Sequence, residues 1–150
     1  MSSPPTAQEQ WHGEQCYVIV AWMVDQARKT RRAWNDVGHA HFLTYSCFQR
    51  WPLLSRERSR NWVISAMESA RKQMDISLWA HVIMPEHVHV LICPQSDDYE
   101  MRRILVALKR PVSDAAREHL ESIQDDEWIK RLSVEYPSRK VFRFWQPGGG

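Results

Sequence analysis

Two histidines separated by one residue carry the clearest chemical signal in the sequence. His87 and His89 flank Val88, directly after Pro85 and Glu86. In a β-strand, residues two apart point to the same face, so both imidazoles would project together. Neutral imidazole nitrogens are ligands for divalent metals. The spacing therefore predicts a pair of metal ligands, although two hydrogen-bonded strand histidines with no ligand would show the same spacing.

The residues around this pair predict an antiparallel β-hairpin. Residues 77–84 and 87–93 are both β-compatible runs, and Pro85-Glu86 separates them. Because side chains alternate along a strand, the apolar residues of the second run should point away from the histidines, into the core. Those residues are Val88, Val90 and Ile92.

Four further segments complete the expected domain. Residues 39–48 predict a first strand, and Ser55 is a plausible N-cap for a helix that runs to about Met74. A second helix starts near Met101, and Pro111 should kink or break it near residues 109–110. Residues 140–145 predict a fourth strand.

The expected order is strand, helix, strand, strand, helix, strand. This is the order of an α+β domain with a ferredoxin-like split βαβ arrangement, which has an antiparallel sheet and helices on one face.

The composition is that of a globular domain. The chain has 150 residues, is 43% hydrophobic and 25% charged, and carries 20 − 18 = +2 formal charges. These values exclude a collagen, a coiled coil or a fully disordered chain. The eight tryptophans are an unusually large number, and Trp62 and Trp79 lie in patterned segments that we expect in the core. The mild charge means that any DNA-binding surface must be a local patch.

The cysteines and the apolar runs predict a cytoplasmic location. The chain has three cysteines and no CxxC pair, which favours buried free thiols over a disulfide framework or a zinc ribbon. The longest apolar run, residues 16–24, is much shorter than the about 20 residues that span a bilayer. We therefore expect no membrane partner.

Three blocks of sequence resemble one family of transposases. Residues 34–54 (including GHAHFLT), residues 80–92 (AHVIMPEHVHVLI) and residues 143–150 (RFWQPGGG) occur in the family's order. Together they resemble the single-tyrosine HUH transposases, and most of all the REP-associated tyrosine transposases, with His87 and His89 as the HUH motif. The resemblance runs from about Arg31 to Gly150. It therefore predicts a transposase-like HUH domain at residues 31–150, after a poorly defined N-terminal extension at residues 1–30.

The resemblance implies a metal-dependent activity on DNA. In the family, two histidines help to hold Mg²⁺ or Mn²⁺, which here implies His87 and His89 as metal ligands with Glu86 orienting His87 from behind. A tyrosine attacks the scissile phosphate and forms a 5′-phosphotyrosine intermediate during transposition. The implied partner is hairpin or single-stranded DNA at transposon or repeat ends, and the resemblance leaves a homodimer open.

The nucleophile is the point at which the chain departs from the family pattern. The family's tyrosine lies on a helix beyond the FWQPGGG-like segment, and none of the four tyrosines of the chain has a matching context. These are Tyr17, Tyr45, Tyr99 and Tyr136. We therefore expect a C-terminally truncated member that lacks the catalytic helix, keeps the histidine pair and does not cleave DNA strands. The alternative is a non-catalytic regulator, derived from a transposase, that binds hairpin or single-stranded DNA.

Basic and aromatic residues gather in several places and suit contacts with phosphates and bases. The same clusters also fit a solvated protein surface. The predicted DNA-binding residues are Arg31, Arg32, Trp34, Arg50, Lys109, Arg110, Arg143 and Trp145. A third class, an unrelated metallo-hydrolase, would need a further ligand cluster such as a His-x-His-x-Asp-His run, which the sequence does not contain.

Overall fold

A computed structural model describes residues 38–148. The predicted N-terminal extension, together with Arg31, Arg32 and Trp34, lies outside these residues. The elements are β1 (His41–Ser46), the 3₁₀ turn η1 (Phe48–Arg50), α1 (Glu57–Gln73), β2 (Ile76–Ile83), β3 (His87–Pro94), α2 (Met101–Ser122), α3 (Asp126–Arg131), β4 (Ser133–Tyr136) and β5 (Arg139–Phe142).

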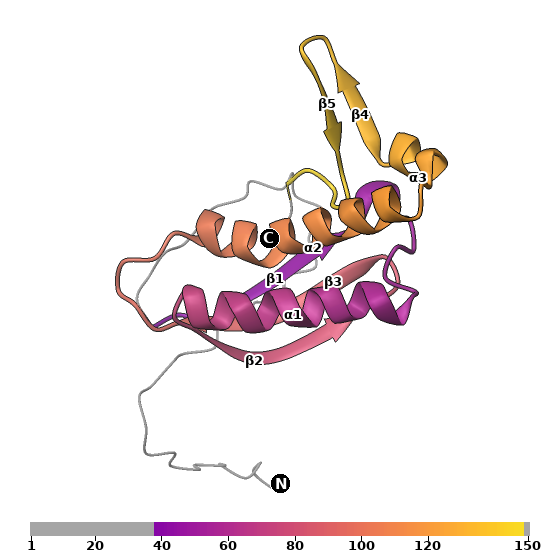
Figure 1. Ribbon diagram of the computed structural model, residues 1–150. Coiled ribbons are helices and arrows are strands. Elements are labelled where there is room, and N and C mark those ends of the chain that lie inside the picture. The colour runs from indigo at the N-terminus through magenta and orange to yellow at the C-terminus, as the bar shows by residue number, and fades with distance from the viewer. Residues whose placement is uncertain (1–37, 149–150) are drawn as a thin grey trace, which may run out of the picture.

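The main sheet is antiparallel and has the strand order β1-β3-β2. Both long helices, α1 and α2, lie on one face of it (Figure 1). The other face of the sheet carries the histidine pair. The α+β split βαβ arrangement expected from the sequence is therefore confirmed.

The predicted hairpin of β2 and β3 is also confirmed. His89 of β3 lies opposite Val82 of β2 on one side and opposite Thr44 of β1 on the other, so β3 is the central strand. Val88, Val90 and Ile92 point under the helices and are fully buried, as their alternation with the histidines predicts. A register shift between Leu78 and Ala80 interrupts the pairing of β2.

The prediction of a full fourth strand in this sheet is wrong. Residues 139–142 form β5, which pairs with β4 in a separate hairpin that projects from the domain (Figure 1). Only the segment after β5 reaches the main sheet, where Trp145 forms an isolated bridge with Cys47. The Phe48 N–H donates to the Phe144 carbonyl at 2.8 Å, and the Gln146 N–H donates to the Ser46 carbonyl at 2.8 Å.

The start of the first helix differs from the prediction by one residue. The helix begins at Glu57 with Arg56 as its N-cap, and no side chain caps it. Ser55 instead closes a turn, because its N–H donates to the Pro52 carbonyl at 3.2 Å and its carbonyl accepts from the Arg60 guanidinium at 2.7 Å.

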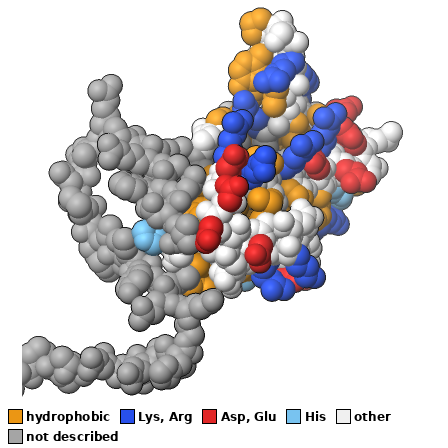
Figure 2. Space-filling view, turned by 90° about the vertical axis from the view of Figure 1, so that its left-hand side faces the viewer, with side chains coloured by type: hydrophobic (Ala, Val, Ile, Leu, Met, Phe, Trp, Pro, Cys, Tyr) orange, Lys and Arg blue, Asp and Glu red, His pale blue; other side chains and the backbone are white. Residues whose placement is uncertain are grey.

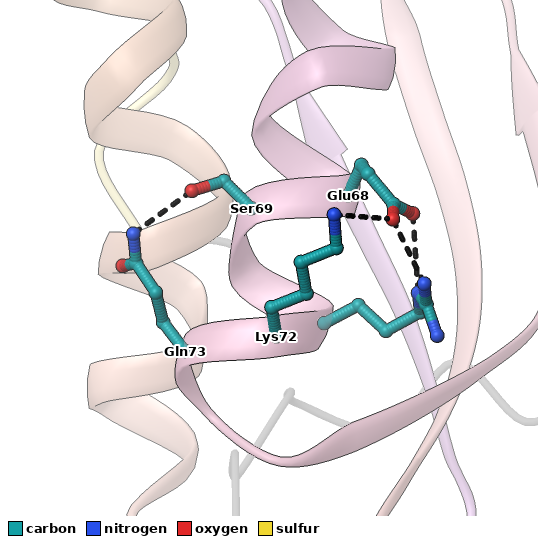
Figure 3. A network of polar contacts seen from close by, with 5 residues as sticks. Glu68, Ser69, Lys72 and Gln73 are labelled. Atoms are coloured by element: carbon teal, nitrogen blue, oxygen red, sulfur yellow. Dashed lines mark hydrogen bonds and ion pairs between the residues drawn. The ribbon is translucent and has the colours of Figure 1, made fainter.

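The inner and outer faces of α1 differ sharply. Val63, Met67 and Ala70 are buried against the sheet, whereas Glu68 on the outer face contacts Arg71 at 2.8 Å and Lys72 at 3.3 Å (Figure 3). These contacts hold the pKa of Glu68 at about 2, chiefly through the hydrogen bonds from Arg71 and Lys72.

Pro111 does not break α2, which is helical from Met101 to Ser122. Its ring is exposed, while Leu108 and Val112 on either side of it are buried. We attribute the continuity of the helix to this burial, which holds both halves against the core and offsets the hydrogen bond that proline cannot donate.

Of the two tryptophans expected in the core, only Trp62 packs there. Trp62 is partly buried and packs against the core, but Trp79 is 43% exposed. It sits at the register shift of β2, where the strict alternation that would bury a side chain is lost. Within residues 38–148, no helix combines the length and apolarity that a bilayer crossing requires.

Candidate metal and DNA-binding site

The two histidines of β3 meet at their outer ring nitrogens. The Nε2 atoms of His87 and His89 lie 2.9 Å apart, and the ring centroids are separated by 4.6 Å with an interplanar angle of 86°. Both side chains leave the same face of the central strand, as their spacing predicts. The sheet therefore brings two imidazole nitrogens to one point.

The Nδ1 atom of each imidazole contacts a side-chain oxygen of a neighbouring residue. Glu86 Oε1 lies 3.1 Å from His87 Nδ1, and Thr44 Oγ1 lies 2.8 Å from His89 Nδ1. In the absence of a metal, the two Nε2 atoms form a hydrogen bond with each other. A Nδ1–H that donates to such an oxygen directs the Nε2 lone pair to this point, where a metal ion would replace that bond. Glu86 therefore contacts the histidine that the sequence predicts it to orient.

The fold fixes the positions of both Glu86 and Thr44. The Glu86 carbonyl accepts the Cys47 N–H at 2.8 Å, which ties the β2–β3 turn to the end of β1. Thr44 is the cross-strand neighbour of His89. The role of Thr44 is not evident from a linear motif, because it depends on the register between β1 and β3.

The two imidazoles can supply two of the ligands of a divalent cation. Imidazole nitrogens suit borderline divalent ions best, and Mn²⁺ accepts them more readily than Mg²⁺ does. Within residues 38–148, no group of three or more His, Cys, Asp and Glu side chains is placed to hold a metal ion. Within these residues, any further ligand would therefore be water, a bound phosphate or another type of donor.

An exposed aromatic ring borders the histidine pair. Phe42 of β1 is 67% exposed, and its ring lies parallel to His89 at 5.4 Å with an interplanar angle of 11°. Val82, opposite His89 on β2, is also exposed. Apolar side chains on an open sheet face next to polar groups are typical of a binding surface. Phe42 and Thr44 are two residues apart in β1, so both point to the face that carries the histidine pair, but the sequence does not mark either as functional.

The predicted DNA-binding residues that the structure describes lie on different elements. Arg50 is exposed in the turn after β1, with a φ of 56°. Arg110 is exposed on α2 and contacts Asp114 at 3.6 Å. Lys109 is half-buried, and its Nζ lies 5.9 Å from the centroid of the Tyr45 ring. Arg143 donates to the Tyr136 hydroxyl at 2.7 Å on the projecting hairpin.

The assignment of Trp145 to DNA binding is wrong in this structure. Its side chain is only 5% exposed, and its ring packs edge-on against Tyr45 at 5.0 Å. Its indole N–H donates to the Lys109 carbonyl at 2.9 Å. Because the ring is enclosed, no base can stack on it, and its role is to pack the segment after β5 onto α2.

The described tyrosines lie away from the histidine pair. Tyr45 is buried on the opposite face of β1, and burial raises its pKa well above the ordinary value. Tyr99 is buried and hydrogen-bonded to His41 at 2.7 Å. Tyr136 stands on the projecting hairpin. None of these three hydroxyls has a contact with His87 or His89 in this part of the chain.

Comparison with solved structures finds the same fold in two transposase structures. The chain superimposes on a candidate transposase from Deinococcus radiodurans R1 with a TM-score of 0.55 and 16% identity, covering 83% of each chain. It also superimposes on a REP-associated tyrosine transposase bound to a REP hairpin, with a TM-score of 0.55 and 17% identity. That match covers 82% of this chain and 60% of the other, so the chain spans less than two thirds of the hairpin-bound transposase.

The likeness at this level of identity establishes the fold. No protein-family model matches the chain, and no curated protein matches it by sequence.

Proposed function

We propose that the chain is a transposase-like HUH domain that binds hairpin or single-stranded DNA, with His87 and His89 holding Mg²⁺ or Mn²⁺. The observation that carries this proposal is the convergence of the two Nε2 atoms, 2.9 Å apart, on the open face of the sheet. The fold shared with the transposase structures supports the choice of DNA as the partner.

The residues around the pair have the properties that a strand of DNA requires. Phe42 offers an exposed ring on which a base can stack. The two imidazoles can present a divalent cation to a phosphate of the same strand. A bound cation would neutralise phosphate charge and act as a Lewis acid. Glu86 and Thr44 keep the two rings oriented for this role.

The placement of the tyrosines favours binding over cleavage for residues 38–148. Tyr45 and Tyr99 are buried, and Tyr136 lies on the β4–β5 hairpin, outside the sheet that carries the pair. We therefore retain the alternative of a non-catalytic DNA-binding regulator derived from a transposase. Both versions fit a cytoplasmic protein, and a homodimer is compatible with both.

The experiment is a titration with a fluorescent DNA stem-loop that carries an unpaired 5′ flank, in the presence of Mn²⁺. We expect saturable binding that weakens steeply as salt rises, because lysines and arginines displace counterions from phosphates. A blunt duplex without flank or loop is the matched control and should bind more weakly. Equal affinity for both DNAs, or no binding to either, would contradict the proposal.

A gel assay for a covalent adduct separates the two versions. The regulator predicts that no protein–DNA adduct survives denaturation. A metal-dependent adduct that disappears in one tyrosine-to-phenylalanine variant would instead identify a strand transferase and its nucleophile.

A further inference from the structure

The hairpin of β4 and β5 projects from the body of the domain (Figure 1). Tyr136 pairs with Arg139 next to the turn, and Ser133 pairs with Phe142 at the base. Four residues per strand at about 3.3 Å each give a projection of about 13 Å. Figure 2 shows Lys and Arg side chains on this projection, below an apolar tip.

The two faces of the hairpin differ in charge. Alternation places Val134, Tyr136, Arg139 and Val141 on one face, and Ser133, Glu135, Lys140 and Phe142 on the other. On the second face, Glu135 lies directly opposite Lys140, so the two charges offset each other. The first face has no acidic residue and is the cationic face.

Arg143 adds a second cation to the first face. It follows Arg139 and Val141 at the same alternation, and its guanidinium lies 5.7 Å from the centroid of the Tyr136 ring, where it also donates to the hydroxyl. Tyr136 is 43% exposed. An exposed aromatic ring between two arginines is suited to a sugar–phosphate backbone, because arginine binds phosphate and the ring covers apolar sugar surface.

The base of the hairpin is firmly attached at the end of the sheet where His87 lies. The Arg143 N–H donates to the Leu132 carbonyl at 2.6 Å, and Trp128 of α3 packs edge-on against Trp51 at 5.5 Å. After the hairpin, the Gln146 N–H donates to the carbonyl of Ser46, the cross-strand neighbour of His87.

We propose that the β4–β5 hairpin docks into a groove of duplex DNA, with the face of Tyr136, Arg139 and Arg143 toward the backbone. This inference rests on the proposed function. It assigns binding of the duplex stem of the DNA to the β4–β5 hairpin, and binding of the unpaired strand to the face that carries the histidine pair. A two-stranded ribbon fits the major groove of B-DNA, which is about 12 Å wide. The attachment near His87 would direct the strand that leaves the stem toward the open sheet face.

The test compares two neighbouring charges on opposite faces of the hairpin. Arg139→Ala and Lys140→Ala each remove one exposed cation from the same strand, so their effects on net charge are equal. Affinity is measured by fluorescence anisotropy for a DNA stem-loop and for a single strand of equal length that cannot pair. We expect Arg139→Ala to weaken stem-loop binding about fivefold and to reduce the salt slope by about one. Lys140→Ala should change it less than twofold.

The possible outcomes distinguish a failure of the docking proposal from a failure of the proposed DNA-binding function. If both variants bind the stem-loop like the wild type, or lose equal affinity, the proposed docking face is wrong while DNA binding stands. If Arg139→Ala weakens the unpaired strand as much as the stem-loop, the hairpin does not read a duplex. If the wild type binds no DNA at all, the proposed function fails and the docking proposal falls with it.

Discussion

The indole N–H of Trp145 donates to the main-chain carbonyl of Lys109, joining residues 36 positions apart at a distance of 2.9 Å. Through this bond, the segment after β5 is attached to the middle of α2. The same carbonyl also accepts from the Ser113 hydroxyl at 3.3 Å, so it keeps one partner if the indole is removed.

The substitution Trp145→Phe should therefore lower the free energy of unfolding by about 1–3 kcal/mol, through the lost hydrogen bond and lost packing volume. Urea unfolding measures this change. DNA affinity of the folded fraction should stay within twofold of the wild type. A large loss of DNA affinity with unchanged stability would show that a DNA base stacks on Trp145, contrary to what its burial indicates.

Cys47 should be almost inert toward thiol reagents in the folded protein. Burial raises the pKa of its thiol to about 12, so at pH 8 the reactive thiolate is scarce. In a Cys16→Ser background, the two remaining cysteines, Cys47 and Cys93, are both buried. Labelling with a chromogenic disulfide should be slow in buffer and complete in urea. Rapid labelling of Cys47 in buffer would show that the contact between β1 and Trp145 opens readily.

Thr44 should tune the affinity for metal through His89. Replacing it with valine removes the oxygen at His89 Nδ1, which lies 2.8 Å away, and leaves a side chain of similar shape. We expect Thr44→Val to weaken Mn²⁺ binding about tenfold or more, as loss of such support does at other metal sites. Thr44→Ser keeps the hydroxyl and should restore most of the affinity. Calorimetric titration with Mn²⁺ measures both, and equal losses in the two variants would assign Thr44 a packing role only.

The contacts of Glu68 predict a small pH dependence of stability. Its pKa is lowered in the folded state to about 2, chiefly by hydrogen bonds from Arg71 and Lys72. The carboxylate therefore contributes stability above its unfolded value of about 4.3, and this contribution is lost as the pH falls toward 2. Wild type and Glu68→Gln should differ at pH 6 and converge near pH 2. Because the Glu68 carboxylate is exposed, salt should shrink the difference in the free energy of unfolding. A difference between the two proteins that stays constant from pH 6 to pH 2 would contradict this prediction.

The sequence predicted those parts of the fold that depend on local patterns. Strict alternation located His87 and His89 on one face and Val88, Val90 and Ile92 on the other, because a strand has only two faces. It did not predict that residues 139–142 would pair with residues 133–136 in a separate hairpin rather than join the main sheet, since both pairings suit the same short β-compatible run.

The supports of the site depend on long-range register. Thr44 reaches His89 only because β1 and β3 pair with these two residues opposite each other, a relationship across 45 positions that no local spacing contains. Trp145 was misassigned for a related reason. An aromatic residue among arginines has the same local sequence whether it faces solvent or, as here, packs against Tyr45.

The most direct test of the central claim is the binding of Mn²⁺ to the wild-type chain, to His89→Ala and to His81→Ala, measured by calorimetric titration. His81 is an exposed histidine of β2 in the same sheet and serves as the matched control. The account predicts one Mn²⁺ bound by the wild type and by His81→Ala, and an affinity at least about tenfold lower for His89→Ala. Equal affinities in all three proteins, or no Mn²⁺ binding by the wild type, would contradict the assignment of the histidine pair as a metal site.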